Sequence, residues 1–156
     1  MRVPILLAGL AVLAACDASA PGTATEPETT AEIASLTASP SWVLVSFSET
    51  DVVRPSTIAF ADSNGVAEGD EWAGEASGLA ACNRYVGTFT APDLAGGDLA
   101  IYVDGITEIA CGDSDDAYER VYAEALEAVT SFVMMGNGRL RMTGAEGLEL
   151  VFEQGG

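Results

Sequence analysis

Apolar and polar positions divide the chain into three parts. Residues 1–15 are almost continuously apolar, with a single charge at Arg2. Residues 16–40 are mostly small and polar, and they carry too little apolar surface to offset the entropy lost on ordering. Alternating apolar and polar residues begin at Trp42 and continue almost to the end. The pattern therefore predicts a leader, a flexible tether and one folded domain over residues 41–156.

Within the predicted domain, short segments rich in aromatic and β-branched residues alternate between apolar and polar positions, as half-buried strands do. The first five predicted strands are Trp42–Phe47, Thr57–Phe60, Trp72–Ala76, Arg84–Thr90 and Leu99–Val103. Three more follow the single helical segment, and they are Phe132–Met135, Arg139–Thr143 and Leu148–Phe152. Glycine-rich turns join these last three, which predicts an antiparallel meander.

One segment, beginning at Asp116 and reading DAYERVYAEALEAVTSF, has the periodicity of an amphipathic helix. Its apolar positions are Tyr118, Val121, Tyr122, Ala125, Leu126 and Val129. Asp116 and Glu119 have the spacing of a capping box, so we expect Asp116 to cap the helix. The order of strands, one helix and further strands predicts a small α+β domain. In it a curved, mostly antiparallel sheet (a partial barrel) packs against one amphipathic helix.

The apolar leader is shorter than the roughly 20 residues that a membrane-spanning helix needs. A charged start, a short apolar run and small residues at the end are typical of a secretory signal peptide. Its last three residues are Leu-Ala-Ala, and Cys16 follows them. This Leu-Ala-Ala-Cys segment resembles the lipobox of bacterial lipoproteins. That resemblance implies cleavage after residue 15 and lipid on Cys16. The alternatives are an ordinary signal peptide with an incidental cysteine, or an uncleaved anchor.

Lipidation of Cys16 would fix the mature chain to a membrane, because two or more acyl chains anchor a protein stably. We therefore predict a protein of the bacterial cell envelope, lipid-anchored, with its domain on the periplasmic or extracytoplasmic side. Asp17 resembles a retention signal for the inner membrane and favours that membrane. The choice between inner and outer membrane stays open.

Composition excludes several kinds of chemistry. The chain has 24 acidic residues, six Arg, no Lys and no His, which gives a formal charge of −18. So acidic a protein is repelled by nucleic acid, whose binding depends on Lys and Arg. Without His and Lys, the commonest general base, the Ser-His and Cys-His pairs, most zinc sites and Schiff-base chemistry are absent. We interpret the acidity as solubilising, with a dedicated acidic surface for a partner as the alternative.

Leu-Ala-Ala-Cys occurs a second time, at residues 79–82, but no apolar run precedes it there. Cys82 therefore needs another explanation than lipidation. Once Cys16 carries lipid, Cys82 and Cys111 are the two remaining thiols. In an oxidising compartment such an even pair usually forms a disulfide. The alternative is two buried thiols that pack as small apolar groups.

Several segments, taken in order, resemble the META domain (HslJ-like) family. They are the opening Trp42 and Leu44, the segment Cys82-Asn83-Arg84-Tyr85-Val86-Gly87, Thr107–Cys111, the amphipathic helix and the closing Leu-rich hairpin. Two residues depart from the family pattern. Ala81 stands where the family usually has Gly, and this difference concerns the backbone shape of the turn before Cys82. Ile109 stands where the family often has Met. The resemblance covers the whole predicted domain. It implies a small α+β fold on envelope proteins and lipoproteins, links to stress and antibiotic tolerance, and no catalytic residues.

Asn83, Arg84 and Tyr85 are the candidate binding residues. The alternative, which we favour, is that Asn83 bonds backbone groups in a turn, Tyr85 belongs to the core and Arg84 pairs with a carboxylate. The acidic clusters lack the spacing of a calcium loop. We therefore predict no metal site, no cofactor and no catalytic residue.

These features together predict a non-enzymatic, lipid-anchored envelope protein. It would bind an unknown envelope protein or support the envelope under stress. One alternative is a module that binds a small ligand in a pocket between sheet and helix. Another is a hydrolase that uses two carboxylates, although no pair stands out among the 24 acidic residues.

Overall fold

Eight antiparallel strands form one curved sheet in the order β5-β4-β3-β2-β1-β8-β7-β6. The computed structural model describes residues 36–37, 39–48, 50–52, 54–62, 72–92 and 97–155. Within them the strands are β1 (Trp42–Phe47), β2 (Thr57–Asp62), β3 (Trp72–Ala80), β4 (Asn83–Ala91), β5 (Ala100–Ile106), β6 (Val129–Met134), β7 (Leu140–Gly144) and β8 (Glu149–Gln154). Helix α2 (Asp113–Glu127) connects β5 to β6, and a short 3-10 turn (Ala145–Gly147) precedes β8.

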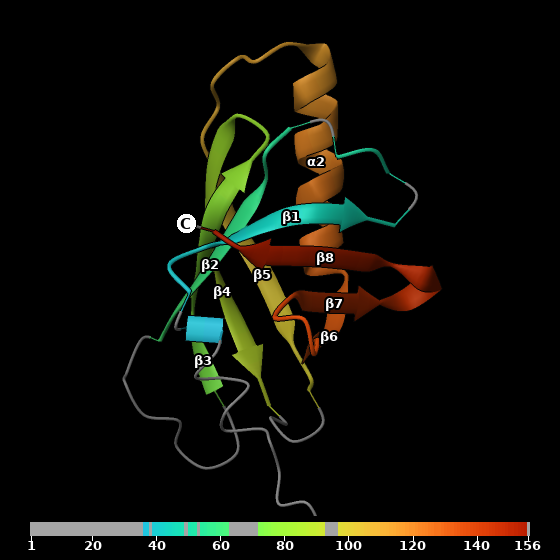
Figure 1. Ribbon diagram of the computed structural model, residues 1–156. Helices are drawn as coiled ribbons and strands as arrows, with labels where there is room; N and C mark the ends of the chain where they lie inside the picture. The colour runs from blue at the N-terminus through green and yellow to red at the C-terminus, as the bar shows by residue number, and fades with distance from the viewer. Residues whose placement is uncertain are drawn as a thin grey trace, which may run out of the picture.

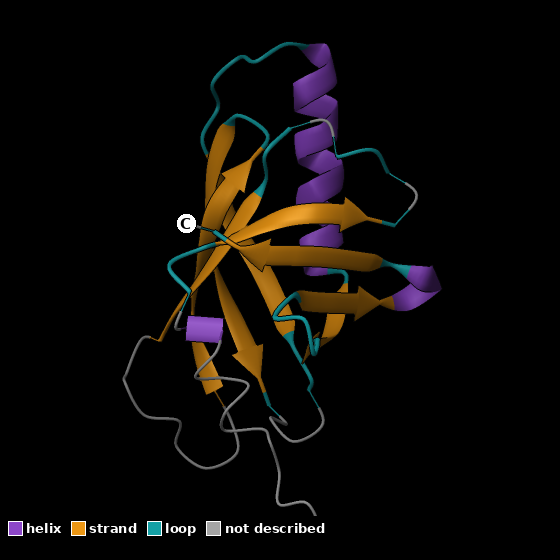
Figure 2. Ribbon diagram, viewed as in Figure 1, coloured by secondary structure: helices purple, strands orange, loops and turns teal. Residues whose placement is uncertain are grey.

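The sheet is strongly curved, because β1, β8 and β7 cross the direction of β3 and β4 (Figure 1). Its two edge strands approach each other at one end, where the Leu99 amide donates to the Thr130 carbonyl at 3.1 Å. The Phe132 amide likewise donates to the Gly97 carbonyl at 2.8 Å. The result is a half-barrel with a single long helix standing beside it (Figure 2).

The core lies between the concave face of the sheet and the apolar face of α2. Buried and exposed residues alternate along β4, as its period of two requires. Tyr122 of α2 meets two strand residues edge-on, with ring centroids 6.4 Å from Phe47 and 6.2 Å from Tyr85. The largest fully buried side chains come from both halves of the sheet and from α2, and they include Trp42, Tyr85, Phe89, Tyr122, Leu126 and Phe152.

The structure confirms the predicted class in its general form, a curved antiparallel sheet with one helix, and the content is mostly β. Each predicted strand is present with somewhat shifted ends, and the meander of the last three strands is confirmed. The largest extension is in β3, which continues to Ala80 instead of ending at Ala76. The tight hairpin to β4 allows this, since every residue of β3 pairs with β4.

Helix α2 begins earlier than predicted, at Asp113 instead of Asp116. The preceding residue, Gly112, has φ 103°, which residues with a side chain rarely adopt, so the chain turns there and the helix starts at once. The Asp116 amide already donates to the Gly112 carbonyl at 3.0 Å, and no described side chain caps the helix. The predicted capping box is therefore wrong. Val121 is 44% exposed and Val129 belongs to β6, so the apolar face is narrower than predicted.

The turn before Cys82 has a glycine-like backbone although residue 81 is alanine. Ala81 belongs to the two-residue hairpin between β3 and β4, in which Ala80 pairs with Asn83. Its φ of 53° lies in the left-handed region, which costs a residue with a Cβ atom roughly 1 kcal/mol. The long paired strands on both sides stabilise this conformation against that cost.

Two buried tyrosines predict a loss of stability at high pH. Burial raises the pKa of Tyr85 and of Tyr122 well above the ordinary value, and both hydroxyls donate to the Thr57 carbonyl, at 2.9 and 3.4 Å. The folded protein therefore keeps these protons, whereas the unfolded chain releases them near pH 10. We expect a free energy of unfolding that is unaffected by these groups below about pH 9 and falls as the pH rises beyond about 10.

Urea unfolding between about pH 8 and 11 measures this effect, and tyrosinate absorbance shows when the hydroxyls ionise. The control is Tyr85→Phe, which has one buried hydroxyl fewer and should show a shallower decline. A decline of the same steepness in that variant would contradict the assignment to Tyr85.

Cys16 and Asp17 lie outside the described residues, as do residues 1–15 and nearly all of residues 16–40. The predicted signal peptide, lipidation and tether therefore stay predictions. In the part of the chain that the structure describes, no helix has both the length and the apolar character needed to cross a bilayer.

Candidate functional site

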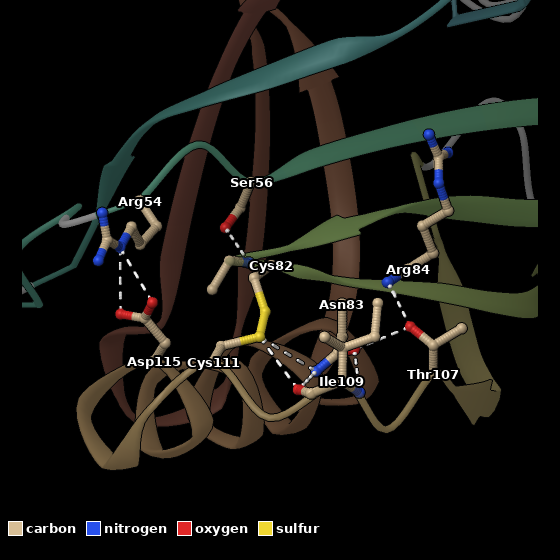
Figure 3. Close-up of a disulfide and its surroundings, with 10 residues drawn as sticks. Arg54, Ser56, Cys82, Asn83, Arg84, Thr107, Ile109, Cys111 and Asp115 are labelled. Carbon is tan, nitrogen blue, oxygen red and sulfur yellow. Dashed lines mark hydrogen bonds and ion pairs between the residues drawn. A yellow bond between two sulfur atoms is a disulfide. The ribbon is translucent and has the colours of Figure 1, made fainter.

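The side chain of Asn83 holds the loop that leads from β5 into α2 (Figure 3). Its oxygen accepts from the Thr107 hydroxyl and from the Ile109 amide, each at 2.9 Å. Its nitrogen donates to the Ile109 carbonyl at 3.0 Å. Asn83 is 2% exposed, so it satisfies its own buried polar atoms while it fixes the loop.

The same loop has two further anchors. A disulfide joins Cys82 to Cys111, with Cα atoms 6.4 Å apart, and so ties the β3–β4 hairpin to the residue before Gly112. Thr107 extends the pairing with β4, because its amide donates to the Arg84 carbonyl at 2.9 Å and its hydroxyl accepts from the Arg84 amide at 3.0 Å. The disulfide predicted from the sequence is present in the structure.

The three candidate binding residues do not form one site. Asn83 and Tyr85 point into the half-barrel, whereas Arg84 between them points to the opposite, exposed face of β4. The Tyr85 hydroxyl bonds to the Thr57 carbonyl inside the core. Among the described residues no carboxylate lies within 4.0 Å of the Arg84 guanidinium, so the predicted ion pair is absent there. The structural alternative therefore holds for Asn83 and Tyr85.

A groove of about 650 Å³ lies between the loop and α2. One wall is the end of β5 and the loop that Asn83 holds, and the other wall is one side of α2. Val103, Ile106 and Ala123 are half-buried in it, and Ile109 is 63% exposed. We call this feature the β5–α2 groove, and its charged lining residues are Glu108, Asp116, Glu119, Arg120, Glu124 and Glu127.

The β5–α2 groove is strongly acidic, since five carboxylates line it and Arg120 is its single cation. Four of those carboxylates belong to α2. Their spacings of three and eight residues are close to whole helical turns, so they lie along one side of the helix. Glu127 also accepts a hydrogen bond from the Val103 amide at 3.3 Å. Of the described residues, none forms an ion pair with any of the five carboxylates.

The start of α2 is fixed separately from the loop. Arg54, in the connection between β1 and β2, donates from Nε to both carboxylate oxygens of Asp115, at 3.1 and 3.2 Å. Asp115 is 7% exposed, although Arg54 is largely open to solvent. Both walls of the β5–α2 groove are therefore held in place before any ligand arrives, which lowers the entropic cost of binding.

The described residues contain no group of three or more His, Cys, Asp or Glu side chains placed to hold a metal ion. The carboxylates of the groove are thus spread along its length instead of converging on one point. This arrangement suits an elongated cationic group better than a single ion.

Comparison with known proteins identifies the family. A model of the META domain matches residues 34–155, which is most of the chain. The chain belongs to the META domain family. The match confirms the resemblance seen in the sequence, and it spans every strand of this META domain as well as α2.

One solved structure is similar to this META domain, the NMR structure of a protein from Burkholderia xenovorans. It shares 23% sequence identity and a TM-score of 0.58, and the match covers 98% of this chain and 99% of that one. At this identity the likeness shows the fold alone. A search of curated proteins finds no match.

The residues of the META resemblance around Cys82 and around Cys111 meet at one end of the half-barrel, where they build one wall of the groove. Sequence reasoning offered a pocket between sheet and helix only as an alternative, and it did not identify the residues that line this groove. The signal on one wall is visible in the sequence, since Asp116, Glu119 and Glu127 recur at helical spacing. The opposite wall depends on how the loop packs against Asn83. This contact joins residues distant in the sequence, so no local sequence pattern predicts it.

Proposed function

We propose that this META domain protein is a lipid-anchored component of the bacterial cell envelope that acts by binding a partner. The observation that carries the binding role is the β5–α2 groove, an open site whose two walls are preformed. The lipobox-like sequence around Cys16 supports the anchor, because it combines a short apolar run with small residues before a cysteine. The family's links to stress, implied by the resemblance, support a role in the stressed envelope.

A binding role is favoured over catalysis by the composition and by the groove. The chain has no His and no Lys, which leaves carboxylates as the main candidates for acid and base work. Four of the five groove carboxylates are spread along one side of α2. A small-molecule site is commonly a mostly apolar pocket that encloses its ligand. The open, acidic groove suits a segment of a larger partner better than such a ligand.

Replacing the predicted lipid attachment residue tests the anchor and the role together. In cells, we expect the native protein in the membrane fraction, with an intact mass that shows acyl chains on Cys16. Cys16→Ser should leave the membrane fraction, because one or more missing acyl chains remove the anchoring free energy of about 0.8 kcal/mol per buried methylene. In a deletion strain under envelope stress, the native gene should restore growth and the variant should not.

The control is Ser19→Ala, which changes a nearby residue and should behave like the native protein. An unmodified Cys16 in native material would overturn the anchor. A deletion strain that grows normally under every envelope challenge would overturn the stress role.

A further inference from the structure

The β5–α2 groove gathers several carboxylates around one concave feature. Outside it, three carboxylates of the described residues have an ion pair, in the pairs Arg54–Asp115, Arg139–Glu153 and Arg141–Glu149. In the groove, five carboxylates share the single Arg120, and none of them has an ion pair among the described residues. Because concave walls focus the field of like charges, the negative potential is concentrated there.

The groove also offers apolar contact. Val103 and Ile106 pack partly against the core, and Ile109 stands on the rim with 63% of its surface exposed. An exposed isoleucine beside carboxylates suits a ligand that has both positive charge and an apolar group. A bare cation would gain nothing from Ile109.

The charge of this chain excludes two occupants. The predicted tether carries Asp17, Glu26, Glu28 and Glu32 and no basic residue, so the groove repels it. A second copy of the chain carries the same formal charge of −18 and is repelled as well. The occupant that complements the groove is therefore a different, basic molecule.

Backbone pairing with the ligand is blocked at the end of the groove where Glu127 lies. β5 is an edge strand of the sheet, but the Glu127 carboxylate already accepts the Val103 amide at 3.3 Å. A peptide cannot add to this edge as a further strand without displacing Glu127. Recognition must therefore depend on side chains.

The length of the groove sets the size of the ligand. Asp116 and Glu127 lie at its two ends along α2, and eleven helical steps span about 16 Å. An extended peptide advances about 3.3 Å per residue, so about five residues fit.

We infer that the β5–α2 groove binds an extended polypeptide segment of about five residues, in which Lys or Arg side chains flank an apolar one. This inference rests on the proposed partner-binding role and names the chemistry of the partner. Basic side chains pair with the carboxylates of both walls, and the apolar side chain contacts Ile109.

A synthetic peptide tests the inference directly. The probe is fluorescently labelled Lys-Lys-Leu-Lys-Lys, added to the purified full chain in detergent and followed by anisotropy at low salt. Glu108→Gln with Glu119→Gln removes one carboxylate from each wall, and we expect binding to weaken roughly three- to tenfold. The matched control, Glu75→Gln with Glu146→Gln, removes two exposed carboxylates outside the groove and should change the affinity less than about twofold.

A second pair of measurements tests the apolar contact. Ile109→Ser should weaken binding of the Leu peptide by roughly threefold, because a partly buried aliphatic contact is lost. It should leave a Lys-Lys-Ser-Lys-Lys peptide unaffected. Far-ultraviolet circular dichroism confirms that each variant is folded.

Two results would overturn the inference. Equal weakening by the groove pair and the control pair would show binding to general surface charge. Spermine that binds with the same dependence on Glu108 and Glu119, together with no preference for Leu over Ser, would show a site for any polycation. Neither result touches the anchor or the stress role, which the Cys16→Ser experiment tests separately.

Discussion

Replacing Cys82 and Cys111 together by Ala lowers the free energy of unfolding by about 3.5 kcal/mol. The two residues are 29 positions apart, and the bridge removes the conformational entropy of that loop from the unfolded chain. For a domain of this size such a change is a large part of the total stability. Urea unfolding of the oxidised native chain and of the double variant measures the difference.

The native chain treated with a reductant is the matched control, and its midpoint should agree with that of the double variant. Coinciding midpoints for the oxidised chain and the double variant would show that the bridge contributes nothing to stability. Amide hydrogen exchange should also rise in residues 107–111, since the bridge ends at Cys111.

Asn83→Ala is expected to lower the free energy of unfolding by about 2–3 kcal/mol. The substitution removes the acceptor of the Thr107 hydroxyl and of the Ile109 amide, and the donor to the Ile109 carbonyl. It also leaves a small cavity at a buried position. Urea unfolding gives the size of the loss, and exchange of the Ile109 amide shows where the loop has loosened.

Asn137→Ala is the control for this experiment. Asn137 also accepts one backbone amide, that of Arg139 at 3.2 Å, but it lies in an exposed turn where water replaces the bond. Its loss should be below about 0.5 kcal/mol. A similar loss for both variants would mean that the bonds of Asn83 do not hold the loop more strongly than a surface turn.

The local pattern was sufficient to predict the strands and the helix. Both the alternation in β1 and β4 and the helical period between Tyr118 and Leu126 depend only on residues close in sequence. The buried residues of these elements follow the same patterns in the structure. The start of α2 was predicted wrongly because Asp116 and Glu119 have the spacing of a capping box. The positive φ of Gly112 starts the helix earlier, and this backbone angle cannot be read from the sequence.

The candidate site was predicted less well, since it depends on distant contacts. The sequence predicted the disulfide between Cys82 and Cys111, and it offered Asn83, Arg84 and Tyr85 as candidate binding residues while favouring separate structural roles for them. In a strand, Arg84 faces away from the other two. The groove has Glu108 on a loop and Glu119 on a helix, and their placement depends on the long-range contacts that dock the loop on Asn83 and on Cys82.

The first strand of the domain lies in the middle of the sheet, between β2 and the last strand, and Trp42 pairs with Gln154. The sheet therefore cannot be completed until nearly the whole domain is free to fold. Contacts between such distant parts of a chain form slowly, because a long loop must close first. If the chain is exported unfolded, as we propose, this delay would favour export, since the two ends of the domain would meet only after translocation.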